Sequence, residues 1–271
     1  LLLGVQTPVC LLILKALGLW PSVKIAVGCS TAAPPVLYAA ADQITRGLTI
    51  YFRECVTRQF LNKRLLVREK PGVYAMGADY LMSVFNDRRS KGVDRAAVRR
   101  SHTDAYAVAT DFETGAAKYF SLRDASIDPV RAVTASLADP VFSHGNVELR
   151  GRRYCDGGIG APFGITNILK RFHPKHLLVI ANGSESQKLD PNRYPNGPAL
   201  GRLPEHIRSA IRAQPETVAK EIAAARKAKD CNVVIFWGPE GRSPVERVGK
   251  TIRDTGKDAA RLFLAPFRTA F

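Results

Sequence analysis

The sequence of 271 residues lacks the signs of a disulfide or zinc scaffold. Its cysteines are scattered, odd in number and without a CxxC spacing, which argues against both. We therefore predict reduced, mostly buried thiols, and we expect neither a metal nor a cofactor. The five thiols belong to Cys10, Cys29, Cys55, Cys155 and Cys231.

Long uninterrupted apolar runs are also missing. The apolar amino-terminal stretch LLLGVQTPVCLLILKALGLW is broken by Gln6, Thr7, Pro8 and Lys15. A membrane-spanning helix needs roughly 18 or more consecutive apolar residues, and a signal peptide begins with a basic region. We expect a cytoplasmic or peripheral membrane protein. Secretion stays open, because the chain starts with leucine rather than methionine.

Acidic residues are scarce: 24 Asp and Glu face 40 Lys and Arg, giving a formal net charge of +16. Residues 46–100 carry 13 basic and 5 acidic residues, so this segment holds an excess of 8, half of the total. Such a segment can face an anionic membrane or nucleic acid, or can simply be a solvated basic surface. No zinc-finger spacing or aromatic RNA-binding motif accompanies it, so an anionic membrane is the partner we expect and nucleic acid is disfavoured.

Strand-like and helical segments alternate along the chain, and no repeat is visible. This order predicts one α/β domain over residues 1–271, a three-layer sandwich around a mainly parallel sheet, with residues 46–100 as a mostly helical, insert-like region. The predicted strands are 23–27, 105–112, 117–122, 176–183 and 232–239, the last two buried, with a hairpin at 146–158. The predicted helices are 8–18, 32–45, 128–138, 210–230 and one within 243–264, and 189–204 reads as a surface loop. The sequence does not indicate the oligomeric state.

The stretch VKIAVGCSTAAPP places Ser30 where a strand turns sharply into a helix. At such an elbow the serine Oγ is exposed at the end of the sheet, and the following backbone N–H groups can stabilise negative charge on an attacked carbonyl. Small neighbours are required two positions away on each side, and Gly28 and Ala32 meet that requirement. A serine that only caps the helix would explain the same pattern, so the motif alone leaves both roles open.

A nucleophilic serine needs a base, and none of the histidines lies in an obvious strand-end motif beside an acid. The five histidines, which we expect to be surface or structural residues, are His102, His144, His173, His176 and His206. Asp156 is the acid that stands out, because Gly157 and Gly158 follow it and allow close approach of a partner. A tight turn alone would also account for the two glycines.

Four stretches in order resemble the patatin-like phospholipases: LKALG with VKIAVGCSTAA, then VATDFETG, TASLADPVF and YCDGGIGAP. The resemblance covers roughly residues 1–183. It implies a patatin-like fold and hydrolysis of lipid or related acyl esters by a serine–aspartate dyad without histidine. It assigns Ser30 as the nucleophile and Asp156 as the acid and base, supported by Gly28, Ala32, Gly157 and Gly158.

Two departures from that family stand out. Its glycine-rich GGGxRG loop, which supplies oxyanion-stabilising N–H groups, falls on LLLGVQTP, where only Gly4 is glycine and Gln6 replaces arginine. Ala32 replaces the second glycine of the elbow, and two prolines follow. We expect the backbone of Gly4, Val5 and Thr31 to stabilise the oxyanion. A catalytically impaired member that binds lipid or anionic membranes is the alternative.

Overall fold

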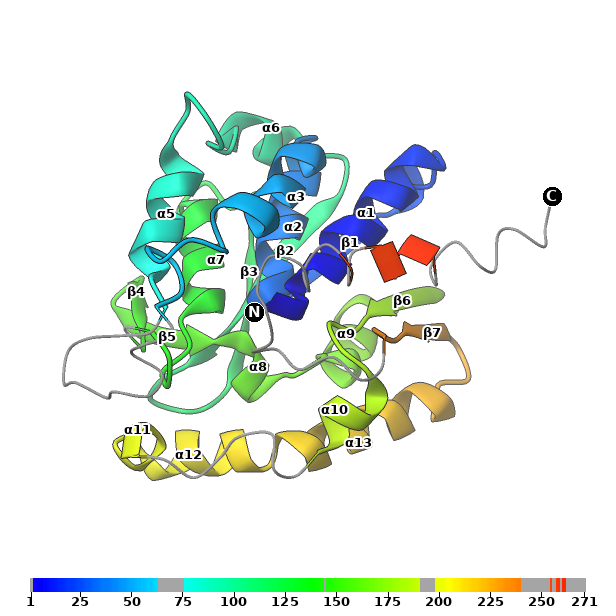
Figure 1. Cartoon of the computed structure of the whole chain (residues 1–271). Helices are drawn as coiled ribbons and strands as arrows, with labels where there is room; N and C mark the ends of the chain where they lie inside the picture. Colours follow the sequence, from blue (N-terminus) through cyan, green and yellow to red (C-terminus); the bar gives the residue numbers. More distant parts are fainter. Residues whose placement is uncertain are drawn as a thin grey trace.

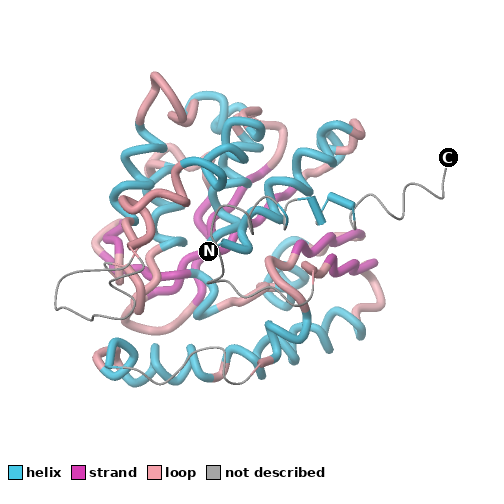
Figure 2. The backbone as a smooth tube through the Cα atoms, viewed as in Figure 1, coloured by secondary structure: helices cyan, strands magenta, loops and turns pink. Residues whose placement is uncertain are grey.

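The computed structural model describes residues 2–62, 76–143, 145–190 and 198–239, and residues 254, 257, 258, 260 and 261. Helices surround two short sheets, so the predicted α/β class is confirmed (Figure 1). Figure 2 shows the strands in two groups, the larger sheet and the separate β6–β7 pair, with helices around them.

The larger sheet has five strands: β1 Ile25–Cys29, β2 Asp104–Asp111, β3 Ala117–Ser121, β4 Val147–Leu149 and β5 Arg152–Asp156. Strand β2 pairs in parallel with β1 and antiparallel with β3 and β5, and β4 pairs antiparallel with β5. Two further strands, β6 His176–Ile180 and β7 Asn232–Phe236, form a separate parallel pair. The sheet structure is therefore mixed.

Helices lie on both faces of the larger sheet. On one face, α2 (Ala33–Ala40) and α7 (Pro129–Leu137) pack against β1, β2 and β5. Alanines on alternate positions of β2 face this side, which allows the helices to approach closely: Ala105, Ala107 and Ala109 are fully buried. On the other face, α8 (Gly157–Gly160) packs against β2, and α9 (Ile165–Phe172) brings Phe172 to 5.1 Å from the Tyr106 ring.

The amino-terminal helix confirms its sequence signals. A short 3₁₀ turn η1 (Leu2–Val5) leads into α1 (Gln6–Ala16). Gly18, at a φ of 69°, ends the helix, with Gly18 N–H donating to the Lys15 carbonyl and Leu19 N–H to that of Leu14. This pair of bonds is a Schellman motif. A second 3₁₀ turn, η2 (Trp20–Ser22), then feeds β1.

Two helices expected as single elements are divided. The segment 32–45 forms a 3₁₀ turn η3 (Ser30–Ala32), then α2, and a new helix α3 (Ile44–Arg53) begins after Asp42, whose φ of 58° breaks the chain direction. Gly47 lies inside α3 against the Tyr38 side chain. Similarly, 210–230 contains the end of α12 (Glu205–Arg212) and α13 (Gln214–Lys227), separated at Ala213 with a proline in the first turn of α13.

The basic region 46–100 contains α3, α5 (Ala78–Asn86) and α6 (Arg95–Arg100), and residues 63–75 lie outside the described residues. Arg88, Arg89 and Arg100 are exposed there. Lys91 is buried instead: its ammonium contacts Thr49 Oγ1, and its carbonyl accepts a 2.5 Å bond from the Tyr38 hydroxyl.

The last two strands differ from expectation in burial. We expected both to be buried, but Leu178 of β6 is 41% exposed and Val234 of β7 is 52% exposed. The reason is that β6 and β7 pair only with each other among the described strands. Residues 191–197 of the expected loop 189–204 lie outside the described residues. The described part of this segment includes the last residue of α10 (Glu185–Leu189) and the short helix α11 (Pro198–Gly201). Most of the expected closing helix, 243–264, also lies outside them.

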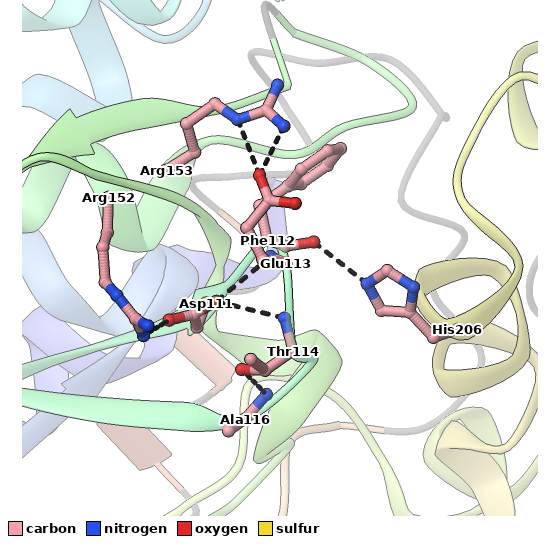
Figure 3. A network of polar contacts seen from close by, with 8 residues as sticks. All are labelled: Asp111, Phe112, Glu113, Thr114, Ala116, Arg152, Arg153 and His206. Carbon is pink, nitrogen blue, oxygen red and sulfur yellow. Dashed lines mark hydrogen bonds and ion pairs between the residues drawn. The ribbon is translucent and has the colours of Figure 1, made fainter.

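A polar network holds the β2–β3 turn against β5 (Figure 3). Buried Asp111 accepts 3.1 Å bonds from the N–H groups of Glu113 and Thr114 and a 2.7 Å bond from Arg152. Arg153 pairs with Glu113, and His206 Nε2 lies 3.0 Å from the Phe112 carbonyl oxygen. The network fixes the start of β5, the strand that ends at Asp156.

All five cysteines carry free thiols, and Cys10, Cys55 and Cys155 are buried, as the scattered spacing predicts. Within the described residues, no group of histidine, cysteine and acidic side chains has the arrangement of a metal site. No helix in the described part of the chain combines the length and apolar character needed to cross a bilayer.

Candidate active site

Strand β2 brings Ser30 and Asp156 together. Strand β1 runs parallel to β2 and ends with Cys29 opposite Val108, whereas β5 runs antiparallel and ends with Asp156 opposite Ala109. Strand β3 overlaps both β1 and β5 in its pairing with β2, so it lies on the opposite edge of β2 from them. Strands β1 and β5 therefore lie end to end along the same edge of β2, with their carboxyl ends facing each other. The carboxyl ends of two strands that are distant in sequence therefore meet at neighbouring positions of β2.

Ser30 sits on a strained elbow between β1 and η3. Its φ is 51°, in the left-handed region that non-glycine residues seldom adopt. Gly28 is required nearby, because a Cβ there would lie 2.6 Å from Ala33 Cα and 2.7 Å from the Ala32 carbonyl oxygen. The Ser30 N–H donates a 2.9 Å bond to Ser136 Oγ of α7, which holds the elbow in place. Strain kept by surrounding contacts is typical of functional positions.

The two predicted site residues are in direct contact. Ser30 Oγ donates a 2.5 Å hydrogen bond to Asp156 Oδ2. The other carboxylate oxygen of Asp156 accepts a 2.8 Å bond from the Gly158 N–H, which fixes the plane of the group. Gly157 must lack a side chain, because a Cβ there would lie 2.0 Å from the Val108 carbonyl oxygen. The two glycines thus let the chain pass closely over β2 while one of them orients the carboxylate.

Burial makes Asp156 a stronger base than an ordinary carboxylate. The residue is only 9% exposed, and desolvation, followed by the nearby charge of Asp139, raises its pKa from 3.8 to about 7. Burial also raises the pKa of Asp139, which accepts bonds from the Val141 and Phe142 N–H groups. A carboxylate with a pKa near neutrality can take a proton from a serine hydroxyl and return it to a leaving group.

Cys29, next to Ser30, is not a competing nucleophile. Burial, and then the charge of Asp156, raises the pKa of its thiol well above the ordinary value, and the thiol lies 3.5 Å from the Ala161 carbonyl oxygen. The thiolate is the reactive form of cysteine, so the raised pKa disfavours reaction at this side chain.

Ser30 and Asp156 line a cavity of about 1200 Å³. Its wall also includes the apolar residues Phe142, Phe163 and Ile159.

The amino-terminal turn η1 packs on the elbow. A Cβ on Gly4 would lie 2.8 Å from Thr31 Cβ and 2.9 Å from the Tyr51 ring, so only glycine fits there. The Tyr51 hydroxyl donates a 2.6 Å hydrogen bond to the Thr31 carbonyl oxygen, which links α3 to the turn η3 that contains Ser30. Gly4 and Thr31 both line the cavity, whereas Val5 is fully buried in a cluster with Val9 and Tyr51.

Asn182, which follows β6, connects the first turn of α1 to the elbow. Its Oδ1 accepts a 2.9 Å bond from Thr7 Oγ1, and its Nδ2 donates a 3.1 Å bond to Thr31 Oγ1. Gln6 is fully buried, and its amide has no hydrogen-bond partner among the described residues. A Cβ on Gly238 would lie 2.3 Å from Gln6 Oε1, so the amide points at the end of β7. Thr7 and Gln6 therefore occupy a packed, polar junction.

Sequence reasoning missed three residues at this site: Ser136, Asp139 and Asn182. Two of them lie in the stretch TASLADPVF, which drew attention only for its likeness to a known motif. Asn182 follows a strand, a place where side chains often reach a site. Among the described histidines, His102 lies against the Trp20 carbonyl and His206 against that of Phe112, in line with structural roles. His144 lies outside the described residues.

A comparison with models of protein families finds no match, and a search of curated proteins finds none either.

Proposed function

We propose that this chain is a serine acyl hydrolase that cleaves lipid or related acyl esters through a Ser30–Asp156 dyad. The observation that carries the proposal is the 2.5 Å hydrogen bond from Ser30 Oγ to the buried Asp156 carboxylate. The strained elbow and the raised pKa of Asp156 support it, since both are typical of catalytic groups. The resemblance of four sequence stretches to patatin-like phospholipases points to the same chemistry.

The reaction has two steps. In the first, Ser30 Oγ attacks the ester carbonyl carbon while Asp156 takes the hydroxyl proton, and Asp156 then gives that proton to the departing alcohol oxygen. In the second, Asp156 removes a proton from water, the resulting oxygen attacks the acyl carbon, and the proton returns to Ser30 Oγ as the acid leaves. Backbone N–H groups at Gly4 and Thr31 are our candidates for stabilising the oxyanion.

The test compares p-nitrophenyl butyrate and phospholipid hydrolysis by the native chain, Ser30→Ala and Asp156→Asn. We expect Ser30→Ala to reduce hydrolysis to background and Asp156→Asn to reduce kcat/KM by about 10²–10⁴-fold, the usual contribution of a general base. A fluorophosphonate should label the native chain at Ser30 and leave Ser30→Ala unlabelled, as intact-mass spectrometry would reveal.

Matched controls are Ser83→Ala, on the exposed side of α5, and Asp230→Asn, an exposed residue after α13. Both should retain native rates. Equal rates in the native chain, Ser30→Ala and Asp156→Asn would reject the proposal.

The alternative is a lipid-binding protein with impaired turnover. Residues 4–7 carry a single glycine, and the Ser30 N–H is already bonded to Ser136. Loss of one oxyanion donor typically lowers kcat by about 10²–10³-fold. Charge-dependent liposome binding without hydrolysis or fluorophosphonate labelling would favour this alternative.

A further inference from the structure

The backbone N–H of Thr31 is the candidate oxyanion donor at the elbow. In this kind of turn the role belongs to the N–H of the residue that follows the serine. The Ser30 N–H is already bonded to Ser136 Oγ at 2.9 Å. Thr31 is the second residue of η3, and the first N–H groups of a helical turn have no partner within that turn. The direction of the Thr31 N–H therefore matters for the proposed chemistry.

Thr31 is held by three parts of the chain that are distant from each other in sequence. The Tyr51 hydroxyl donates a 2.6 Å hydrogen bond to its carbonyl oxygen. Gly4 packs so closely that a Cβ there would lie 2.8 Å from Thr31 Cβ. Asn182 Nδ2 donates a 3.1 Å bond to Thr31 Oγ1. This last contact is a hydrogen bond to the side chain, so it selects one rotamer of Thr31.

The Asn182 side chain is itself fixed at its other end. Its Oδ1 accepts a 2.9 Å bond from Thr7 Oγ1 and a 3.3 Å bond from the Thr7 N–H. Because a backbone N–H can only donate, the amide atom that faces Thr7 must be the oxygen, and the nitrogen then faces Thr31. Thr7 is only 4% exposed, so these bonds lie away from water. The bond from Asn182 to Thr31 therefore has a defined direction.

The backbone that carries Asn182 is tied to the end of β7 on both sides. The Ala181 N–H donates a 2.9 Å bond to the Phe236 carbonyl, and the Gly238 N–H donates a 2.8 Å bond to the Gly183 carbonyl. Gly183 adopts a φ of 126°, which a side chain would strain. Asn182 therefore projects from a well-anchored strand end, and such supports hold neighbouring groups in one orientation.

We propose that Asn182 is a positioning residue that orients the Thr31 N–H, through Thr31 Oγ1, toward the oxyanion formed on the substrate carbonyl. This inference rests on the proposed function. It concerns the carbonyl oxygen of the substrate rather than the proton transfer between Ser30 and Asp156. An oxyanion donor acts mainly when negative charge develops in the transition state. Loss of Asn182 should therefore slow turnover without weakening substrate binding.

The test measures kcat and KM for p-nitrophenyl butyrate in Asn182→Ala, Thr31→Val and the double variant. Thr31→Val keeps the backbone N–H and removes the Oγ1 to which Asn182 donates. Each single change should lower kcat by about 10–100-fold, no more than the loss of a whole donor, and leave KM within about twofold. The double variant should be no slower than the slower single variant, because both changes remove the same bond.

The trifluoromethyl ketone analogue of the butyrate ester reports on the oxyanion directly. Ser30 Oγ adds to its carbonyl carbon, Asp156 takes the hydroxyl proton, and the carbonyl oxygen becomes negative. The inhibition constant should rise in Asn182→Ala by the factor by which kcat/KM falls. A purely structural loss would instead lower the amount of active enzyme and leave the inhibition constant unchanged.

The matched control is Asn232→Ala, which changes an exposed asparagine at the start of β7 and should keep the native kinetic constants. All variants are assayed well below their Tm. If Asn182→Ala does not fold, Thr31→Val breaks the same bond from the other side and carries the test. Native kcat in folded Asn182→Ala, or single losses that multiply in the double variant, would overturn the inference. Absence of hydrolysis and of fluorophosphonate labelling in the native chain would instead reject the proposed function, and this role with it.

Discussion

Asp139 illustrates how one side chain can adjust the dyad from outside it. It lines the same cavity as Asp156, and the Asp156 N–H donates to the carbonyl of the residue just before it, Ala138. Its charge is the second contribution, after burial, to the raised pKa of Asp156. Two adjacent carboxyl groups disfavour simultaneous ionisation, so Asp139 helps keep Asp156 basic enough to accept the Ser30 proton.

We predict that Asp139→Asn shifts the acid limb of the kcat/KM profile to lower pH. Hydrolysis requires ionised Asp156, so the rate of the native chain should rise through a pKa of about 7. Removing the neighbouring negative charge lowers the pKa of Asp156. The asparagine oxygen can still accept the bonds from Val141 and Phe142, so the loop should keep its shape. An unshifted acid limb in a variant of native stability would contradict this role.

At the scale of elements, Glu221 connects α13 to the turn that follows α8. This buried carboxylate accepts bonds of 3.0 and 3.1 Å from the Phe163 and Gly164 N–H groups. The Phe163 ring lies 5.6 Å from that of Trp237, just after β7, and forms part of the cavity wall. Glu221 therefore holds the wall of the site against the helix outside it.

We predict that Glu221→Gln gains stability relative to the native chain as pH rises. Burial raises the pKa of Glu221 from 4.5 to about 7. Because the folded pKa is above the unfolded one, the stabilising contribution of Glu221 is complete below about pH 4.5 and is lost as pH rises through 7. Glutamine cannot ionise but can accept the same bonds.

The Tm of Glu221→Gln should therefore be close to the native Tm at pH 5 and higher than it at pH 8. At pH 8 the free energy of unfolding of Glu221→Gln should exceed the native value by up to about 3 kcal/mol. Glu221→Ala, which removes the acceptor, is the matched control and should be less stable than Glu221→Gln at both values. A difference between Glu221→Gln and the native chain that does not change with pH would refute this account.

At the scale of the whole molecule, part of the excess positive charge lies on one exposed region. The exposed arginines Arg88, Arg89 and Arg100 belong to the α5–α6 region, at the opposite end of the molecule from α13 (Figure 1). An anionic membrane attracts each nearby Lys or Arg by about 1 kcal/mol.

Replacing Arg88, Arg89 and Arg100 by glutamine should weaken binding to phosphatidylserine vesicles by roughly 100-fold, with little effect on a soluble ester. The control replaces Lys220, Lys227 and Lys229, exposed residues of α13 and just after it, by glutamine. Vesicle flotation at two salt concentrations measures the effect. Equal loss of binding in both triple variants would show that net charge, rather than this surface, governs attachment.

Local signals predicted much of the fold, because they act within a few residues. Gly18 ends α1, and Arg150 and Gly151, both at positive φ, turn the β4–β5 hairpin. The break between α2 and α3 at Asp42 could not be predicted in this way, because no glycine or proline marks it in the sequence. Nor does an apolar run such as HLLVIANG reveal that, within the described part of the chain, its strand pairs on one flank only.

The candidate site divides in the same way. Ser30 and Asp156 could be selected from the sequence because each lies in a short motif in which glycine is needed for steric reasons. Ser136, Asp139 and Asn182 act through positions that only the folded chain brings near the elbow. Nothing in a single sequence relates α7 or the end of β6 to residue 30.

The opposed approach of β1 and β5 along β2 also bears on how the protein folds. Ser30 and Asp156 are separated by 126 positions, so their contact closes one of the larger loops of the chain and should form late. In refolding from denaturant, labelling of Ser30 by a fluorophosphonate should therefore lag behind the recovery of secondary structure. Its time course would report when the β4–β5 hairpin docks.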